Sequence, residues 1–271
     1  MSRYAAAFES LRARKEKAFI PFFVLGDPDY ATSLEVIRAA LRGGADMLEL
    51  GIGFSDPMAD GPTIQAADLR ALKAGMTVAR CFQLVREVRS FSDVPIGLLV
   101  YCNLIYRRGV ERFFREASAA GVDGILAADV PVEEASPFLK AGERWGVDPI
   151  FMVTPATTPK RLEAILSCAR GFLYMVALLG VTGARGSLHP AALKLLRRVR
   201  SHTDLPVCAG FGISRPEHVR TLARSGADGA IVGSAVVDIL ARNLSSKPRM
   251  VREVGSYVRR MKAETILRRG R

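Results

Sequence analysis

Along most of the 271-residue chain, short apolar runs alternate with longer segments whose apolar residues recur every three or four positions. The short runs are typical of buried strands, and the longer segments are typical of helices with one apolar face. Eight runs predict strands at residues 18–25, 47–52, 96–101, 124–128, 149–153, 172–177, 206–209 and 229–232. Strands that alternate with helices form a parallel sheet, and eight of them close a barrel. We therefore expect an α/β fold, a (β/α)8 TIM barrel that forms one domain over residues 1–271.

A further helical pattern, SRYAAAFESLRARKE at residues 2–16, precedes the first strand and predicts an extra N-terminal helix. An open, doubly wound sheet is the alternative fold, but no GxGxxG fingerprint opens a helix after the first strand. In a barrel, functional side chains come from the C-terminal ends of the strands and from the loops that follow them. Those positions therefore hold the candidate functional residues.

Composition limits the compartment and the cofactor. Hydrophobic residues make up 49% of the chain, enough for a large core, and no apolar run is long enough to span a membrane. The N-terminus lacks the apolar segment of a secretory signal. The four cysteines show no CxxC spacing, and there are only three histidines. We expect reduced thiols, no metal site and a cytoplasmic protein.

The net charge of +12 is concentrated at the C-terminal end of the chain. Residues 241–271 contain ten lysines and arginines but only two acids, a net charge of +8. No zinc finger or aromatic RNA-binding motif accompanies these residues. The favoured interpretation is a solvated helix face or an edge that meets an acidic partner, and nucleic-acid binding is the less favoured alternative.

Glu49 interrupts the apolar strand DMLELGI. Side chains alternate between the two faces of a strand, so Leu48, Leu50 and Ile52 share one face and Glu49 shares the other with Met47. If the leucines pack against helices, Glu49 points into the barrel, where an unpaired carboxylate is costly. Pairing with a base is the structural alternative, but a raised pKa would suit a general acid or base. We favour the functional interpretation.

Asp60 follows in the loop SDPMADGPTIQ. Asp-Gly is a turn signal, and an Asp here could also cap the helix that begins near Pro62. The local sequence therefore does not decide between turn formation and a functional role for Asp60.

Three glycine-rich loops follow the last three predicted strands: LLGVTGARGS, AGFGIS and VGSAV. Glycines let backbone N–H groups approach an anion, and the last two loops lie where barrels bind phosphate. A phosphorylated substrate is the favoured interpretation, although glycines also form ordinary turns. The first loop, with Gly180, Gly183 and Gly186, could be a mobile lid.

Apolar and aromatic residues near the strand ends are candidates for a substrate pocket. Phe22, Leu99, Tyr101 and Phe211 could line it, but they could equally be ordinary barrel filling. Tyr174 lies within a strand, where tyrosine is more often a core residue than a catalytic one.

The segments FIPFFVLGDPD, LELGIGFSDPMADGPTIQ, GVTGARG, GFGIS and VGSAVV occur in this order. Together they closely resemble the tryptophan synthase alpha subunit over nearly the whole chain. The resemblance implies a lyase that cleaves indole-3-glycerol phosphate to indole and glyceraldehyde 3-phosphate. It implies no cofactor or metal in this chain, and no nucleic-acid or membrane partner. It also implies a pyridoxal-phosphate-dependent beta subunit, an alpha2beta2 tetramer and a tunnel for indole.

The resemblance also suggests residue roles. Glu49 would exchange a proton with indole C3, Asp60 would accept the indole N–H, and Tyr174 would support the glycerol part. Substrate-binding positions fall on Phe22, Leu99 and Phe211 for the indole, and on Gly183, Gly212, Gly233 and Ser234 for the phosphate. Tyr101 is a further predicted substrate-binding residue.

Two positions depart from the family pattern. Gly53 stands where proline is usual, which would loosen the loop that carries Asp60, and Ala177 stands where serine is common. Gly53 and the basic charge leave an alternative, a free-standing lyase that releases indole without a beta subunit. A binding or scaffold protein that uses the basic C-terminus is a third hypothesis.

Overall fold

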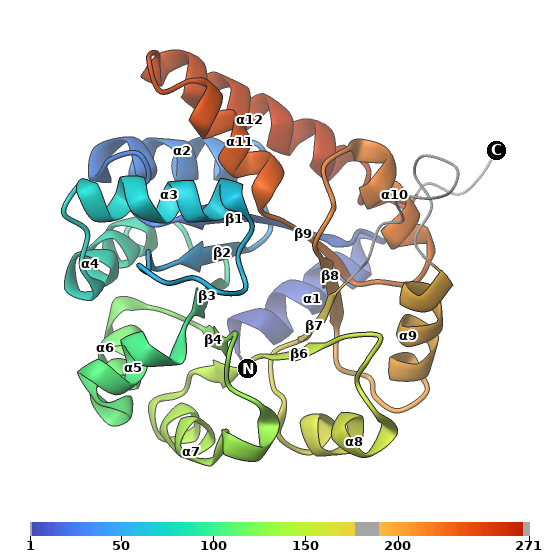
Figure 1. The fold of residues 1–271 in the computed structure, drawn as a ribbon. Coiled ribbons are helices and arrows are strands. Elements are labelled where there is room, and N and C mark those ends of the chain that lie inside the picture. The colour runs from blue at the N-terminus through green and yellow to red at the C-terminus, as the bar shows by residue number, and fades with distance from the viewer. Residues whose placement is uncertain (1, 177–189, 268–271) are drawn as a thin grey trace.

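The computed structural model describes residues 2–176 and 190–267. In these ranges the strands form one parallel sheet in the order β5-β4-β3-β2-β1-β9-β8-β7-β6, surrounded by helices (Figure 1). The strands are β1 Ala18–Val24, β2 Leu48–Gly51, β3 Ile96–Val100, β4 Gly124–Ala127, β5 Asp148–Pro149, β6 Phe151–Val153, β7 Leu173–Val176, β8 Val207–Gly210 and β9 Gly229–Val232. The TIM barrel is confirmed.

The helices alternate with the strands as the sequence predicts. They are α1 Arg3–Ala13, α2 Tyr30–Arg42, α3 Pro62–Lys73, α4 Val78–Arg89, α5 Cys102–Arg108, α6 Val110–Ala120, α7 Ser136–Trp145, α8 Pro159–Cys168, α9 Pro190–Arg200, α10 Pro216–Arg224, α11 Ser234–Arg242 and α12 Lys247–Ala263, with a 3-10 turn η1 at Val132–Glu134. Left-handed glycines end α6 at Gly121 and α7 at Gly146, because glycine adopts positive φ without strain. No helix in the described ranges is both long and apolar enough to cross a membrane.

The fifth predicted strand is divided. β5 pairs with β4, β6 pairs with β7, and Ile150 lies between the two short segments. Proline has no N–H to donate, so Pro149 interrupts the hydrogen-bond ladder at this point. β5 and β6 together occupy the fifth strand position, and the amide of Ile150 still donates to the carbonyl of Ile125 at 3.0 Å. The sheet therefore follows the eight-position barrel that the pattern predicts.

Side chains on the two faces of β2 pack into two different hydrophobic clusters. Leu48 and Leu50 belong to the large cluster between strands and helices, whereas Met47 belongs to the smaller cluster inside the barrel. This arrangement confirms the predicted alternation in β2. Glu49 is therefore on the interior face, and its residue is only 6% exposed.

Helix α1 lies across the ring of strands and closes the N-terminal end of the barrel (Figure 1). Its Tyr4 ring packs edge-on against Phe172, with centroids 5.3 Å apart. Gly97 and Gly124 make room for this ring, since a Cβ atom at either position would lie within 3 Å of Tyr4 atoms. The extra helix predicted from the sequence thus becomes part of the barrel core.

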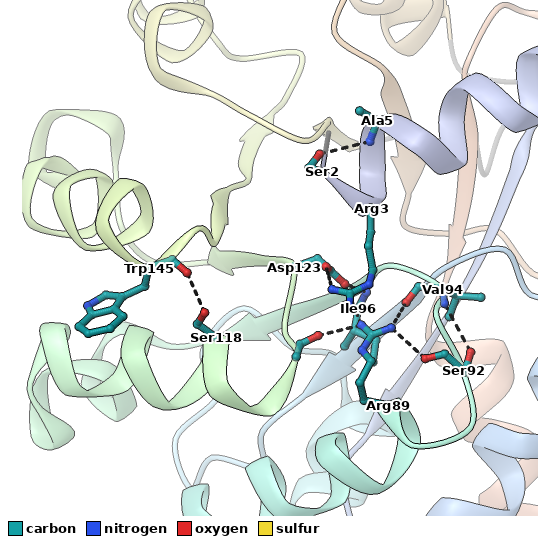
Figure 2. Close-up of polar contacts among 11 residues, drawn as sticks. Ser2, Arg3, Ala5, Arg89, Ser92, Val94, Ile96, Ser118, Asp123 and Trp145 are labelled. Atoms are coloured by element: carbon teal, nitrogen blue, oxygen red, sulfur yellow. Dashed lines mark hydrogen bonds and ion pairs between the residues drawn. The ribbon is translucent and has the colours of Figure 1, made fainter.

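At this end of the barrel the buried Asp123 carboxylate is paired, as Figure 2 shows. Its carboxylate accepts hydrogen bonds from Arg3 at 2.9 Å, from Arg89 at 2.8 Å and from the backbone amide of Ile96 at 2.8 Å. The Arg89 guanidinium also donates to the carbonyl oxygens of Ser92, Val94 and Gly121. Arg89 therefore ties the end of α4 to the starts of β3 and β4.

Candidate active site

A cavity of about 300 Å³ opens at the C-terminal ends of the strands, opposite α1. The lining residues come from β1, β2, β3, β7 and β9, from the loops after β2, β8 and β9, and from helices α3 and α11. Nine of the eleven predicted site residues line it: Phe22, Glu49, Asp60, Leu99, Tyr174, Phe211, Gly212, Gly233 and Ser234. The structure therefore brings together residues that lie up to 212 positions apart in the sequence.

Glu49 faces this cavity from the centre of β2. Its Cα pairs with Phe22 on β1 and with Gly97 on β3, so its surroundings are largely apolar. Within the described part of the chain its carboxyl has no hydrogen-bond or ion-pair partner. Burial, with a smaller contribution from the nearby Asp60 charge, raises the pKa of Glu49 to about 8. A carboxyl group that holds its proton near neutral pH can act as a general acid and then as a base.

Asp60 reaches the cavity from the loop between β2 and α3. Its Oδ2 accepts a hydrogen bond of 2.8 Å from the Tyr101 hydroxyl, which in turn accepts one of 3.1 Å from the amide of Ala59. The Tyr101 ring stacks on Phe54 in the same loop, with centroids 5.2 Å apart. Burial raises the pKa of Asp60, and the Tyr101 hydrogen bond opposes that shift. Tyr101 is therefore placed to hold the loop and to orient its acid, and it is not among the residues that line the cavity.

Two aromatic residues, Tyr174 and Phe211, form another part of the cavity wall. The Tyr174 ring meets Phe211 edge-on, with centroids 5.8 Å apart. Gly210 has to lack a side chain here, because a Cβ atom would lie 2.1 Å from the Tyr174 hydroxyl oxygen. Burial, followed by the charge of Glu49, raises the pKa of Tyr174 well above its usual value, so its hydroxyl stays protonated. Phe211 itself has a positive φ of 71° and is 47% exposed, which makes it a strained and accessible edge of the cavity.

Gly212, Gly233 and Ser234 occupy one end of the cavity. Helix α11 begins at Ser234, and the amides of its first two residues, Ser234 and Ala235, have no acceptor within the helix, whereas those of Val236 and Val237 donate to the Gly233 carbonyl oxygen. The partial positive charge at a helix N-terminus favours an anion, most of all a phosphate group. Gly212 has a positive φ of 76°, a conformation that glycine adopts at no cost. This end of the cavity can therefore cradle a phosphate group.

Asp68 is a buried acid that the sequence analysis missed. It is 4% exposed on the inner face of α3, and its Oδ2 has no hydrogen-bond partner among the described residues. Burial, then the charges of Asp60 and Asp27, raise its pKa to about 7. The signal was present in PTIQAADLRALK, where Asp68 falls at i+4 from the apolar Ile64 on the buried face.

A second buried acid nearby, Asp27, has an ion-pair partner. Asp27 is completely buried and accepts two hydrogen bonds from Arg70 on α3, at 2.6 and 2.9 Å. Arg70 thus compensates Asp27, whereas Asp68 has no equivalent cation within the described ranges. Of these two buried acids, Asp27 has an ion-pair partner and Asp68 has none among the described residues.

Some predicted positions cannot be placed in the cavity. Gly183, the glycines Gly180 and Gly186 of the predicted lid, and Ala177 lie outside the described residues. Gly53 is described, and it is not one of the positive-φ glycines. A Cβ atom there would come within 3.3 Å of the Asp68 carbonyl oxygen, a tight but modest contact. Backbone conformation therefore does not demand glycine at this position.

The fold and the cavity define a class of protein. A TIM barrel with a buried carboxyl group of raised pKa in its cavity, a second acid and a helix N-terminus that can accept a phosphate group is typical of a barrel enzyme that performs acid–base chemistry on a phosphorylated substrate. No group of three potential metal-ligating side chains occurs within residues 2–176 and 190–267.

Comparison with known proteins gives the family. The family model for the tryptophan synthase alpha chain matches residues 8–266. The tryptophan synthase alpha chain of Methanoregula boonei is 56% identical, with 94% of this chain and 96% of that protein covered. The chain therefore belongs to the tryptophan synthase alpha chain family, whose members cleave indole-3-glycerol phosphate and work with a beta subunit.

Solved structures agree with this assignment. The tryptophan synthase subunit alpha from Legionella pneumophila superposes with a TM-score of 0.90 at 32% identity, covering 98% of each chain. A chain of the tryptophan synthase complex from Pyrococcus furiosus is 38% identical with a TM-score of 0.83, covering 92% of this chain and 99% of that one. The beta subunit expected from the sequence is thus the established kind of partner for this family.

Proposed function

We propose that the cavity cleaves indole-3-glycerol phosphate by a retro-aldol reaction in which Glu49 is the catalytic acid and base. The observation that carries this proposal is the unpaired Glu49 carboxyl, buried beside apolar walls with a pKa of about 8. Indole is a poor carbanion leaving group, so the reaction needs a proton at C3 before the bond to the glycerol part can break. A carboxyl group that is protonated at neutral pH can supply that proton.

The proton and electron pairs then move in a balanced sequence. Glu49 transfers its proton to indole C3, and the ring nitrogen takes the positive charge of an indolenine cation. The C3–glycerol bond breaks, its electron pair returns to the ring, and the glycerol hydroxyl becomes the aldehyde. The Glu49 carboxylate accepts the hydroxyl proton and is ready for another turnover. Indole and glyceraldehyde 3-phosphate are released.

The remaining residues position the substrate. Asp60 accepts the indole N–H and stabilises the charge that develops on nitrogen, and the Tyr101 hydroxyl holds the Asp60 carboxylate in place. Phe22, Leu99 and Phe211 contact the indole ring. Tyr174 donates its hydroxyl toward the glycerol part, which its raised pKa supports because the hydroxyl stays protonated.

The phosphate group occupies the other end of the cavity. Gly212, Gly233 and Ser234 surround it, aided by the N-terminus of α11. Gly183 would complete the cradle. The helix N-terminus would hold the phosphate while Glu49 and Asp60 address the indole, so the two kinds of polar group would orient the substrate in the cavity.

We also infer the wider setting of the reaction. The chain would act as one domain over residues 1–271, in the cytoplasm, in an alpha2beta2 tetramer. Pyridoxal phosphate would belong to the beta subunit, which would receive indole through an internal tunnel. Support comes from family membership and from the similarity to a tryptophan synthase complex.

Indole release from indole-3-glycerol phosphate tests the proposal, measured with and without a cognate beta subunit. We expect indole with the chain alone and faster release with the beta subunit. An Asp60→Asn variant should be slower by about 100-fold, because it loses an anion at the charged nitrogen. Asp204→Asn, at an exposed acid before β8, is the matched control and should be unchanged. Absence of indole from the wild-type chain under both conditions would overturn the proposal.

A further inference from the structure

A second cavity, of about 700 Å³, lies beside the substrate cavity. It is bounded by α11, by α12 and by the loop after β8, elements that are neighbours in Figure 1. Ser214, Ala235 and Asp238 line both cavities. The two spaces are therefore contiguous at the end of the substrate cavity that suits a phosphate group.

Three guanidinium groups line this second space, which we call the arginine cavity: Arg215 before α10, Arg242 at the end of α11 and Arg260 on α12. Arg242 donates to the main-chain oxygen of Asp238 at 3.2 Å, and Arg260 donates to the Ser256 hydroxyl at 2.8 Å. These bonds orient the arginines without neutralising them. None of the three forms an ion pair with a carboxylate in the described ranges.

The acids of the arginine cavity compensate only part of this charge. Glu253 is already paired with Arg249 at 2.7 Å and also accepts a hydrogen bond from Asn243. Asp238 accepts a hydrogen bond from the Thr63 hydroxyl and remains the one lining carboxylate without an ion pair in the described structure. When Arg249 is counted as the partner of Glu253, four cations and two acids leave an excess of two positive charges, which matches a phosphate dianion.

Other basic residues at this end of the chain have structural partners. Lys247 pairs with Asp29 at 3.0 Å, and Lys262 pairs with Glu16 at 2.9 Å. The positive charge noted in the sequence is thus partly used to attach α12 to the barrel. The arginines that line the arginine cavity are a different set, and the ion pairs of the fold do not account for them.

The arginine cavity is connected to the phosphate end by hydrogen bonds. The Tyr257 hydroxyl on α12 donates to the Ser214 carbonyl oxygen at 3.0 Å, in the loop that also carries Gly212. Helix α11 begins at Ser234 in the phosphate cradle and presents Asp238 and Arg242 to the arginine cavity. An anion in one space therefore lies against the same helix and loop as an anion in the other.

We propose that the arginine cavity is a second anion site, which binds a phosphate monoester or inorganic phosphate dianion beside the substrate's own phosphate cradle. The proposal rests on the proposed function, because it takes the adjoining cavity to be the substrate site. Guanidinium groups bind phosphate oxygens through paired N–H donors. A cluster of them at the mouth of a cavity also raises the local concentration of a dianion.

Isothermal titration calorimetry of the full chain with inorganic phosphate tests the site directly. Wild-type protein should bind two phosphate ions, and the double variant Arg242→Gln/Arg260→Gln should bind one. The matched control Arg224→Gln/Arg252→Gln removes the same charge from exposed arginines on α10 and α12 outside the arginine cavity, and it should bind two. One phosphate site in the wild type, or two in the double variant, would overturn the proposal.

The kinetics of indole release identify the natural source of the phosphate. If the substrate's own phosphate passes through the site, kcat/KM at low ionic strength should fall about tenfold in the double variant while kcat is unchanged. If free phosphate is the ligand, kcat/KM should be unchanged, and added phosphate at constant ionic strength should alter the rate for the wild type only. If the double variant shows neither of these effects relative to the control, a site linked to catalysis is contradicted.

Failure of the proposed function and failure of the second anion site can be told apart. A wild-type chain that releases no indole would disprove the proposed function, and the phosphate titration would still decide the second site. The single variant Arg215→Gln, in the loop before α10, replaces the double variant if the latter unfolds. It should weaken the second phosphate affinity several-fold, and an unchanged affinity would count against the arginine cavity.

Discussion

At the N-terminal end of the barrel, the Asp123 carboxylate accepts hydrogen bonds from two arginines and a backbone amide. At the C-terminal end, Glu49 is as deeply buried, yet no described residue donates to it or pairs with it. A buried carboxyl group with partners stays charged and fixes neighbouring elements, whereas one without partners retains its proton. The same chemical group therefore contributes to stability at one end and to reactivity at the other.

The strongest test of this contrast is Glu49→Gln. We expect indole release to fall about 1,000-fold, because general acid–base catalysis is lost. Below about pH 4.5 the free energy of unfolding should change by less than about 1 kcal/mol, since a neutral amide there replaces a neutral acid of the same shape. Urea denaturation and the indole assay measure the two quantities. A large loss of stability would indicate that Glu49 has a structural partner.

Asp123→Asn should give the opposite result. The substitution removes the anion from a nearly buried pair with Arg89, and we expect a loss of about 3 kcal/mol in unfolding free energy. Activity of the folded protein, assayed well below its unfolding temperature, should stay within about twofold of wild type because Asp123 lies far from the cavity lining. Arg3→Gln, which removes the more exposed partner, should cost much less. Equal effects of the two substitutions would contradict the contrast.

Both activity and stability should depend on pH through the Glu49 carboxyl group. The group acts as an acid while protonated, so kcat/KM should fall about tenfold per pH unit above its pKa of about 8. Its folded pKa lies above the ordinary 4.5, so its contribution to stability is complete below pH 4.5 and is lost as the pH rises to about 8. Urea titrations of wild type and Glu49→Gln across this range isolate the effect. A constant difference between the two proteins would disprove the raised pKa.

A smaller effect is expected within the active site at Tyr101→Phe. The change removes the 2.8 Å hydrogen bond to Asp60 but keeps the ring that stacks on Phe54. A hydrogen bond to a charged group contributes about 1.5 kcal/mol, so kcat/KM should fall about tenfold. Tyr106→Phe, on exposed α5, is the matched control. Loss of activity as large as in Glu49→Gln would show that Tyr101 does more than position Asp60.

Much of this architecture follows from local sequence. Strand–helix alternation predicts the barrel, and the period of two in DMLELGI places Glu49 on the interior face. The glycine loops predict one end of the cavity, where Gly212, Gly233 and Ser234 are found. The division between β5 and β6 was not predicted, because the pattern does not show how Pro149 affects hydrogen bonding to two neighbours.

Contacts between distant residues could not be predicted in the same way. Tyr101 was assigned to the substrate pocket from its position at a strand end, and the structure places its hydroxyl on Asp60, 41 residues earlier. Asp68 appeared to be one more residue of a helix, and the absence of a described hydrogen-bond partner for its Oδ2 depends on what α3 packs against. The roles of Glu49 and Asp60 in catalysis remain predictions that the proposed variants test, and the role of Tyr174 also remains a prediction.

Hydrophobic periodicity and side-chain alternation are local properties, so the (β/α)8 barrel, the extra N-terminal helix and the side of β2 on which Glu49 lies follow from the amino-acid sequence alone. Which buried charges are paired depends instead on how distant elements pack together. Asp123 meets Arg3 across 120 residues, Glu49 meets no cation in the described chain, and three arginines gather beside the phosphate end. Barrel closure and strand register bring these groups together or keep them apart, and neither can be read from a local pattern.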